Sequence, residues 1–484
     1  MGEARRDQRR AGLSGISSAL GGLLIFVLCV WRIRCIGLGP DPDTDAYGHF
    51  VIARQFLETP GDLAIHWVWL PLYHLLLAAG IALGAGLDHV RYANALLSSG
   101  TPLLLWWGVR RLRSRVGEGA GFEVRWLPPL AGVLAAAPPI VVTMGTTAQP
   151  ESLFALLLLG AALLLSLERY AWASVVLSAL VLLRYEAWAV AAVVGALVLW
   201  RRWKGVPLSR AALACLVAPG LSVLAWALLR WLDGGQWFGF LRQNQSFAEA
   251  ARAQAPALGW SEIERGLEAA PLWAWSIGLV CLLCGLRRTW RLTSGWFVLL
   301  PLSIAAFLVL GWLTRSHLGL ARHWVCLVPF AALGAANGMA QIAQSCGGLR
   351  RRAQAPVFFL LSALALGLEL RALPEPLRQW REHTAEALLD RRDAGRFLRS
   401  VAPDISILCD DAATEVLSGL PSARFRRNYL GADASAEIRR WARSSELIVM
   451  SAAGRLRAAL PLGELVYGDP AGDGLVGLRV PHGN

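Results

Sequence analysis

Three aspartates near the start of the chain are the first residues whose spacing suggests chemistry. Asp41, Asp43 and Asp45 alternate with other residues in the stretch GPDPDTDAYGHF, directly after a long apolar run. Carboxylates this close together repel one another, so they favour a cation, a proton or water as a partner. The spacing leaves two interpretations open. One is a site that holds a cation or takes up a proton, and the other is a solvated loop that contains proline.

Two glutamates stand at the beginnings of later apolar runs. Glu151 follows Pro150, which is typical of a first helical turn, where the helix dipole favours a carboxylate. Glu186 lies close to Arg184 in the stretch LLRYEAW. Because unpaired charge is costly at membrane depth, we predict that Arg184 and Glu186 neutralise each other.

The composition indicates that these residues belong to a polytopic membrane protein. Of the 484 residues, 55% are hydrophobic and 17% are charged, and the mean hydropathy is +0.46. The net charge of +13 does not indicate nucleic-acid binding, because no basic stretch is interleaved with aromatics on a polar background. We predict about eleven transmembrane helices. The apolar runs lie at 15–34, 91–109, 126–144, 152–167, 170–184, 187–200, 211–230, 271–286, 296–313, 323–342 and 356–372.

The distribution of arginine predicts the orientation of these spans. With the N-terminus in the cytoplasm, the cytoplasmic loops hold about 20 basic residues in roughly 66 positions, against about nine in roughly 114 positions outside. This puts the loop at 37–90 and the C-terminal segment on the outer side. Within that loop, 46–58 has the pattern of an amphipathic surface helix, and 65–86 is predicted to be interfacial.

The C-terminal segment differs from the rest of the chain. A charged amphipathic helix at 381–400 precedes short strand-like runs at 405–409, 447–450 and 465–468. We therefore predict a membrane domain at 1–372 and a small extracytoplasmic α/β domain with a partly parallel sheet at 373–484. Asp410 and Asp411 are most simply interpreted as a helix cap.

The order of several short motifs resembles the GT-C superfamily of polytopic glycosyltransferases, which includes protein O-mannosyltransferases and aminoarabinose transferases. That family has an acidic D-x-D or D-E motif followed by a small residue and tyrosine in its first outer loop, then an interfacial helix, and a late Arg-Tyr/His segment. The matching residues are Asp43-Thr44-Asp45-Ala46-Tyr47, Trp69 to His74, Arg91 and Asn94, Glu151, and Arg322-His323 through Pro329. The resemblance covers roughly 37–330. Glu151 replaces a commoner Asp, and the outer loops have no evident Lys.

The resemblance implies a role for each of these residues. Asp45 would be the general base, with Asp43 and Glu151 holding a divalent cation such as Mg²⁺ or Mn²⁺ or orienting the acceptor. Arg322, His323 and Arg184 would bind the phosphate of the donor. Tyr47, Trp69 and His74 would contact the substrate. The arginines are equally compatible with interfacial anchoring, and histidines such as His66 and His74 are more often structural.

The resemblance also implies an activity. The expected reaction transfers a monosaccharide, a hexose such as mannose or a pentose, from a polyprenyl-phosphate donor with inversion. The acceptor is a glycan, a lipid or a protein on the outer face of a bacterial inner membrane. A secondary transporter is the main alternative, but it would place ionisable residues near mid-membrane in repeated halves. A GT-C-shaped scaffold without catalytic activity is the third possibility.

Overall fold

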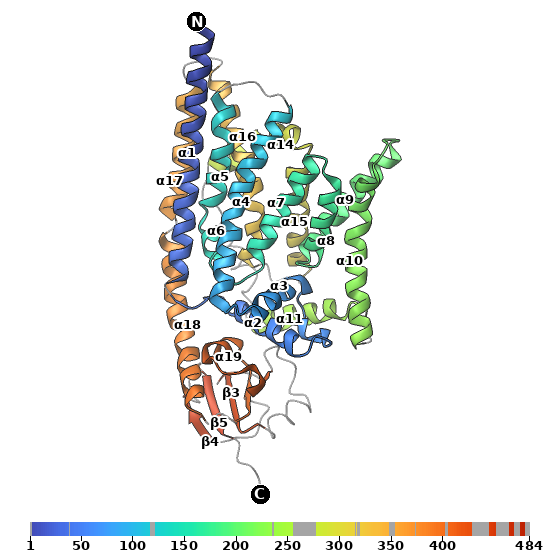
Figure 1. Cartoon of the computed structure of the whole chain (residues 1–484), viewed down its shortest axis with the longest axis vertical. Coiled ribbons are helices and arrows are strands. Elements are labelled where there is room, and N and C mark those ends of the chain that lie inside the picture. The colour runs from blue at the N-terminus through green and yellow to red at the C-terminus, as the bar shows by residue number, and fades with distance from the viewer. Residues whose placement is uncertain are drawn as a thin grey trace. The chain divides into compact units, whose positions relative to one another are not determined.

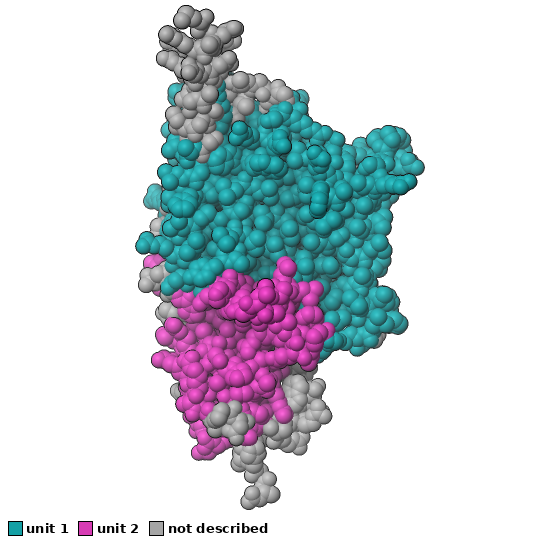
Figure 2. All heavy atoms as spheres, in the orientation of Figure 1, with its two compact units in different colours: residues 1–37, 61–73, 91–377 teal, residues 38–60, 74–90, 378–484 magenta. Residues whose placement is uncertain are grey.

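A computed structural model describes residues 2–37, 39–116, 122–234, 237–254, 277–314, 316, 320–347, 354–372, 374–401, 405–427, 445–451, 464–468 and 475–479. The chain divides into two compact units. Residues 1–37, 61–73 and 91–377 form the first, and residues 38–60, 74–90 and 378–484 form the second (Figure 2).

Each apolar run predicted from the sequence falls on helical structure, although residues 271–276 of one run lie outside the described residues. The helices are α1 Gly2–Ile36, α4 Leu87–Val116, α5 Phe122–Ala136, α6 Pro139–Met144, α7 Glu151–Ser166, α8 Tyr170–Val181, α9 Glu186–Trp203, α10 Arg210–Gly234, α14 Ile277–Thr293, α15 Trp296–Leu313, α16 Val328–Gly347 and α17 Gln354–Ala372. They run side by side, with α1 and α17 along one edge (Figure 1). The predicted polytopic helical membrane fold is confirmed.

Length and hydropathy mark several of these helices as membrane spans. Within the described residues, four segments are long and apolar enough to cross a bilayer by themselves: Ala19–Ile36, Arg210–Gly234, Trp296–Leu313 and Arg322–Ser345. Large apolar side chains such as Leu23, Phe26 and Leu232 are exposed on them, which suits a lipid environment. Shorter apolar helices accompany them, and α7 and α8 form separate helices that pack together. The chain is an integral membrane protein.

Small residues let two helices of the first unit approach closely. Gly334 and Gly338 on α16 face Cys281 and Gly285 on α14, and a methyl group on Gly338 would overlap the backbone carbonyl of Cys281. Helices in lipid associate through this kind of close backbone packing. Cys281 is fully buried at this crossing.

The second unit combines an α/β sheet with segments from the first loop. Its elements include α2 Thr44–Glu58, α18 Pro374–Ser400 and α19 Ala412–Ser418. The strands are β1 Ile407–Cys409, β2 Phe425–Arg427, β3 Leu447–Ser451, β4 Glu464–Tyr467 and β5 Leu475–Arg479, in the order β2-β1-β3-β5-β4. β1 pairs in parallel with β2 and β3, whereas β5 pairs antiparallel with β3 and β4. The sheet core contains Leu398, Ile407, Phe425 and Val449.

Most local elements of this second unit match the sequence predictions. The helices at 46–58 and 381–400, the three strand-like runs and the partly parallel sheet are confirmed. β2 and β5 were not predicted. The segment 65–86, whose interfacial location stays a prediction, overlaps the 3-10 helix η1, Leu63–His66, of the first unit and contains α3, Pro71–Ala82. The boundary predicted at 372–373 and the orientation across the membrane remain predictions.

Candidate active site

Two glutamates of the first unit meet the same arginine. Glu151 and Glu186 are the first residues of α7 and α9, so both carboxylates lie at the positive ends of helix dipoles. Arg184 lies in the turn between α8 and α9. It donates from Nη1 to Glu151 Oε1 at 2.7 Å, from Nε to Glu186 Oε2 at 3.2 Å and from Nη2 to Glu186 Oε1 at 2.7 Å. The predicted pairing of Arg184 with Glu186 is confirmed.

A second basic segment joins this arrangement from the 3-10 helix η2, Ala321–Leu327. Arg322 Nε lies 3.5 Å from Glu151 Oε1, and His323 Nδ1 lies 3.8 Å from Glu186 Oε1. These separations are ion-pair distances, too long for good hydrogen bonds. We call Glu151, Arg184, Glu186, Arg322 and His323 the carboxylate–guanidinium cluster. Two positive and two negative side chains nearly cancel, and His323 supplies a fifth group that can titrate.

One carboxylate oxygen of the cluster has no hydrogen-bond partner among the residues that the structure describes. Glu151 Oε2 is buried and unpartnered, whereas Oε1 of the same carboxylate contacts two guanidiniums. A buried acceptor without a donor is costly, and a catalytic role or a bound water or ion is among the explanations for such an atom. The cluster can therefore accept a hydrogen bond from a hydroxyl group at Glu151.

Polar residues of α4 fix the turn that leads into Glu151. Asn94 Nδ2 donates to the carbonyl oxygens of Thr147 and Gln149, both at 2.7 Å, and Arg91 Nε donates to Thr146 O at 3.0 Å. Both side chains are buried. The family motif that matches Arg91 and Asn94 thus has a physical role here, because it sets the backbone from which α7 starts.

The acidic loop of the second unit is organised by its own carboxylates. Asp41 Oδ1 accepts a hydrogen bond from Asp43 N at 3.1 Å, and Asp43 Oδ1 accepts one from Asp45 N at 3.0 Å. Asp43 is therefore the N-cap of α2, and Asp45 lies in its first turn, partly exposed. Asp41 is fully buried. The alternation of aspartates ahead of a helix was the signal for this cap, and sequence reasoning missed it.

Tyr47 and His74 are buried in the second unit. The Tyr47 hydroxyl donates to Asp41 O at 2.9 Å, and its ring packs against Leu388 and Ala413. His74 Nε2 and His49 Nδ1 lie 2.8 Å apart, so one ring donates to the other. The substrate contacts predicted for Tyr47 and His74 remain predictions.

Trp69 and His66 lie in the first unit, around η1. The rings of Trp67 and Trp69 meet edge to face at 5.7 Å. His66 is buried edge-on against Trp226 at 5.4 Å. Burial, and to a smaller extent the positive charge of Arg230, lower the pKa of His66 to about 4. His66 is consequently neutral at physiological pH, which suits the structural role that we favoured for it.

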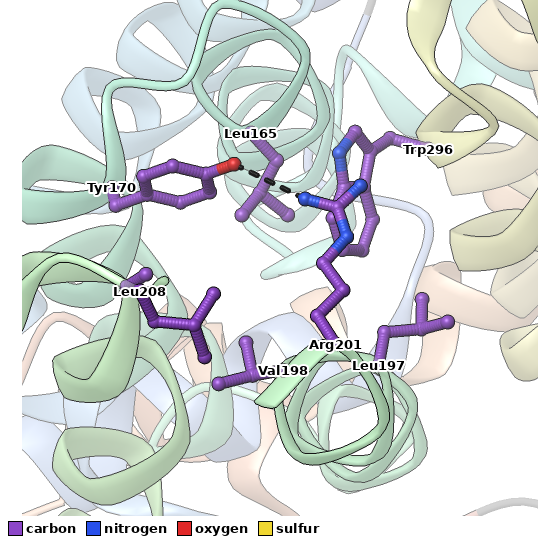
Figure 3. Close-up of a pocket in the computed structure, with 8 residues that line it drawn as sticks. Leu165, Tyr170, Leu197, Val198, Arg201, Leu208 and Trp296 are labelled. Atoms are coloured by element: carbon purple, nitrogen blue, oxygen red, sulfur yellow. Dashed lines mark hydrogen bonds between the residues drawn. The ribbon is translucent and has the colours of Figure 1, made fainter. Parts of the chain in front are cut away.

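A cavity among α7, α8, α9 and α15 is too small to hold a sugar donor. Arg201 donates to the Tyr170 hydroxyl at 3.4 Å and lies 6.0 Å from the centre of the Trp296 ring (Figure 3). The space that these side chains enclose with Leu165, Leu197, Val198 and Leu208 is about 10 Å³. That is roughly the room needed for one water molecule.

The surroundings of Glu151 do not favour a divalent cation. No group of three His, Cys, Asp or Glu side chains among the described residues is arranged to hold a metal ion. Glu151 is flanked by the guanidiniums of Arg184 and Arg322, which would repel a divalent cation. The carboxylate of Asp43 already accepts a hydrogen bond as the N-cap of α2. The metal role of Asp43 and Glu151 stays a prediction.

No protein-family model matches this sequence, and no curated protein matches it. Solved structures do. ArnT from Cupriavidus metallidurans bound to undecaprenyl phosphate has a TM-score of 0.61 and 13% identity, over 95% of this chain and 98% of that chain. The chain has the GT-C fold. The resemblance inferred from the order of the motifs is confirmed at the level of the fold.

Two archaeal structures share the GT-C fold with this chain. An Archaeoglobus fulgidus oligosaccharyltransferase tethered with an acceptor peptide has a TM-score of 0.52 and 12% identity, over 90% of this chain and 69% of that chain. AglB from the same organism, in complex with an inhibitory peptide and a dolichol-phosphate, has a TM-score of 0.50 and 11% identity over the same shares. At such identities the likeness is one of fold.

Proposed function

We propose that this protein is a membrane glycosyltransferase that takes a monosaccharide from a polyprenyl-phosphate donor and passes it to a hydroxyl-bearing acceptor. The carboxylate–guanidinium cluster in a GT-C fold is the observation that supports this proposal most strongly. Three of the structures with this fold were solved with undecaprenyl phosphate, with an acceptor peptide, or with an inhibitory peptide and a dolichol-phosphate. The acceptor is a glycan, a lipid or a protein of the cell envelope. The sugar is a hexose or a pentose, with mannose as one candidate.

The cluster suggests how the donor phosphate is bound. Arg184 already makes three short hydrogen bonds to carboxylates, so we assign it to holding Glu151 and Glu186 in place. Arg322 Nε and His323 Nδ1 lie farther from those carboxylates, at 3.5 Å from Glu151 Oε1 and 3.8 Å from Glu186 Oε1. A phosphate would gain charge-assisted hydrogen bonds from Arg322, and a guanidinium can grip it with two parallel bonds.

The chemical step is a single displacement with inversion. Asp45 takes the proton of the acceptor hydroxyl, and the acceptor oxygen forms a bond to the anomeric carbon. The bond from that carbon to the phosphate oxygen breaks, and polyprenyl phosphate leaves with the electron pair. Arg322 and His323 stabilise its growing negative charge. Glu151 Oε2 orients a hydroxyl of the acceptor.

The proposal includes a location. The cytoplasmic N-terminus and the extracytoplasmic C-terminal domain follow from the arginine distribution, and the membrane is a bacterial inner membrane.

The GT-C fold favours a transferase over a secondary transporter. A scaffold without catalytic activity would share the fold, so binding and turnover have to be measured.

Donor binding is tested with the purified protein in detergent. Undecaprenyl phosphate should raise the unfolding temperature, because a ligand that binds only the folded state stabilises it. The matched ligand is undecaprenol, which has the same chain without the phosphate, and it should raise the unfolding temperature much less. Equal shifts with the two ligands would contradict a phosphate site.

A further inference from the structure

The acidic loop of the second unit is continuous with a helix whose far end is held by buried charges. α2 begins at the Asp43 cap, carries Asp45 in its first turn and ends at Glu58. A helix rises about 1.5 Å per residue, so Arg54 lies roughly 14 Å along α2 from Asp45. Any contact that fixes the end of α2 therefore also fixes the direction in which its first turn points.

Four alternating charges fix that end. Arg427 of β2 binds Glu415 of α19 through two hydrogen bonds of 2.7 and 2.8 Å. Arg54 Nη1 of α2 lies 3.7 Å from Glu415 Oε1, and Glu58 Oε2 of α2 lies 3.8 Å from Arg427 Nη1. We call these four residues the α2 clamp. They join the helix of the acidic loop to the α/β part of the same unit.

Burial makes the Glu415–Arg427 pair of the α2 clamp strong, whereas the two side chains on α2 itself are more exposed, Arg54 at 21% and Glu58 at 42%. The side chain of Glu415 is 0% exposed and that of Arg427 is 9% exposed. A buried ion pair is costly to break, because the remaining partner keeps an uncompensated charge away from water. Apolar packing supports the same geometry, since Tyr47 of α2 lies in one core cluster with Leu388 of α18 and Ala413 of α19.

We propose that the C-terminal α/β segment positions the acidic loop, with Glu415 and Arg427 as positioning residues that hold α2 through Arg54 and Glu58. This inference rests on the proposed function for its effect on transfer. The α/β segment then acts on catalysis without touching the substrate. If the α/β segment loses its contact with α2, turnover should fall. Donor binding should stay unchanged, because Arg322 and His323 are the residues proposed to bind the donor phosphate.

The test uses Arg54→Gln and Glu415→Gln in the full-length protein. We expect kcat to fall by about ten- to a hundredfold, as small displacements of reacting groups can cause. The donor KM should stay within about twofold, and Glu415→Asp should recover part of the loss. Hydrogen–deuterium exchange of residues 44–58 should become faster. Arg54 is partly exposed, so Arg54→Gln tests the inference even where Glu415→Gln fails to fold.

Arg391→Gln is the matched control. It removes an ion pair of 2.9 Å to Asp411 in the same unit, but that pair joins α18 to α19 and not to α2. Its kcat and its exchange at 44–58 should match the wild type. Unchanged exchange and unchanged kcat in folded Arg54→Gln would overturn the inference. Faster exchange at 44–58 in a protein whose wild type transfers no sugar would uphold the α2 clamp and reject the proposed function.

Discussion

Asp45→Asn should reduce sugar transfer by about 10²- to 10⁴-fold, the range that general-base catalysis supplies. Asparagine keeps the size of the side chain but cannot take up the acceptor's proton. Asp45 lies in the first turn of α2, where a carboxylate contributes about 0.3–1 kcal/mol through the helix dipole, so we expect a change of about this size in the free energy of unfolding. Initial rates and thermal unfolding of the purified variant measure both effects.

The control for Asp45 has to be chosen from the structure. Asp41 is in the same loop, but its full burial and its hydrogen bond to Asp43 N make it part of the loop's framework. Asp62 is a better match, because it is exposed and caps η1 through a 3.0 Å hydrogen bond from Ala64 N, which asparagine can preserve. Asp62→Asn should keep wild-type activity. Equal losses in the Asp45 and Asp62 variants would indicate a general effect of loop charge.

Arg322→Ala should weaken use of the donor by about 1.5–3 kcal/mol, the range for a hydrogen bond to a charged group. This corresponds to roughly 10- to 150-fold in kcat/KM for the donor. Folding should survive, because Arg184 continues to neutralise Glu151 at 2.7 Å. Arg322→Lys should recover only part of the loss, since an ammonium cannot form the bidentate contact. Steady-state kinetics over a range of donor concentrations measure the effect.

Variants of two other arginines are compared with Arg322→Ala as possible controls. Arg242→Ala removes an exposed charge from α11, Gly239–Gln254, and should leave donor kinetics unchanged. Arg184→Ala is not an equivalent test, because it would leave two buried carboxylates without their shared partner. Wild-type kinetics in a folded Arg322→Ala protein would remove Arg322 from the donor site.

The helices could be predicted well because a long apolar run is recognised from local composition alone. The short strands were harder. β2 consists of Phe425–Arg427 with two arginines, and β5 contains Gly477, so neither has a clear alternating pattern. Both are strands because they pair with β1 or with β3 and β4, which composition does not reveal.

The candidate site was predictable only in its local parts. Arg184 and Glu186 are near neighbours in the sequence, so their pairing followed from the cost of charge in a membrane. The contact of Arg184 with Glu151 spans 33 positions and depends on how α7 packs near the turn before α9. The link from Arg54 to Glu415 likewise depends on tertiary structure. Spacing along the chain carries no information about such contacts.

Release of polyprenyl phosphate is the most direct test of the proposed glycosyltransferase activity. The purified protein is given a panel of polyprenyl-phosphate hexoses and pentoses together with envelope lipids and glycans from its source cell, and lipid products are resolved by mass spectrometry. We expect the wild type to convert at least one donor to polyprenyl phosphate while a glycosylated acceptor accumulates in equal amount, and Asp45→Asn to lose this conversion. If donors bind but remain intact with the wild type, as with Asp45→Asn, the result would contradict glycosyltransferase activity and favour a scaffold without catalytic activity.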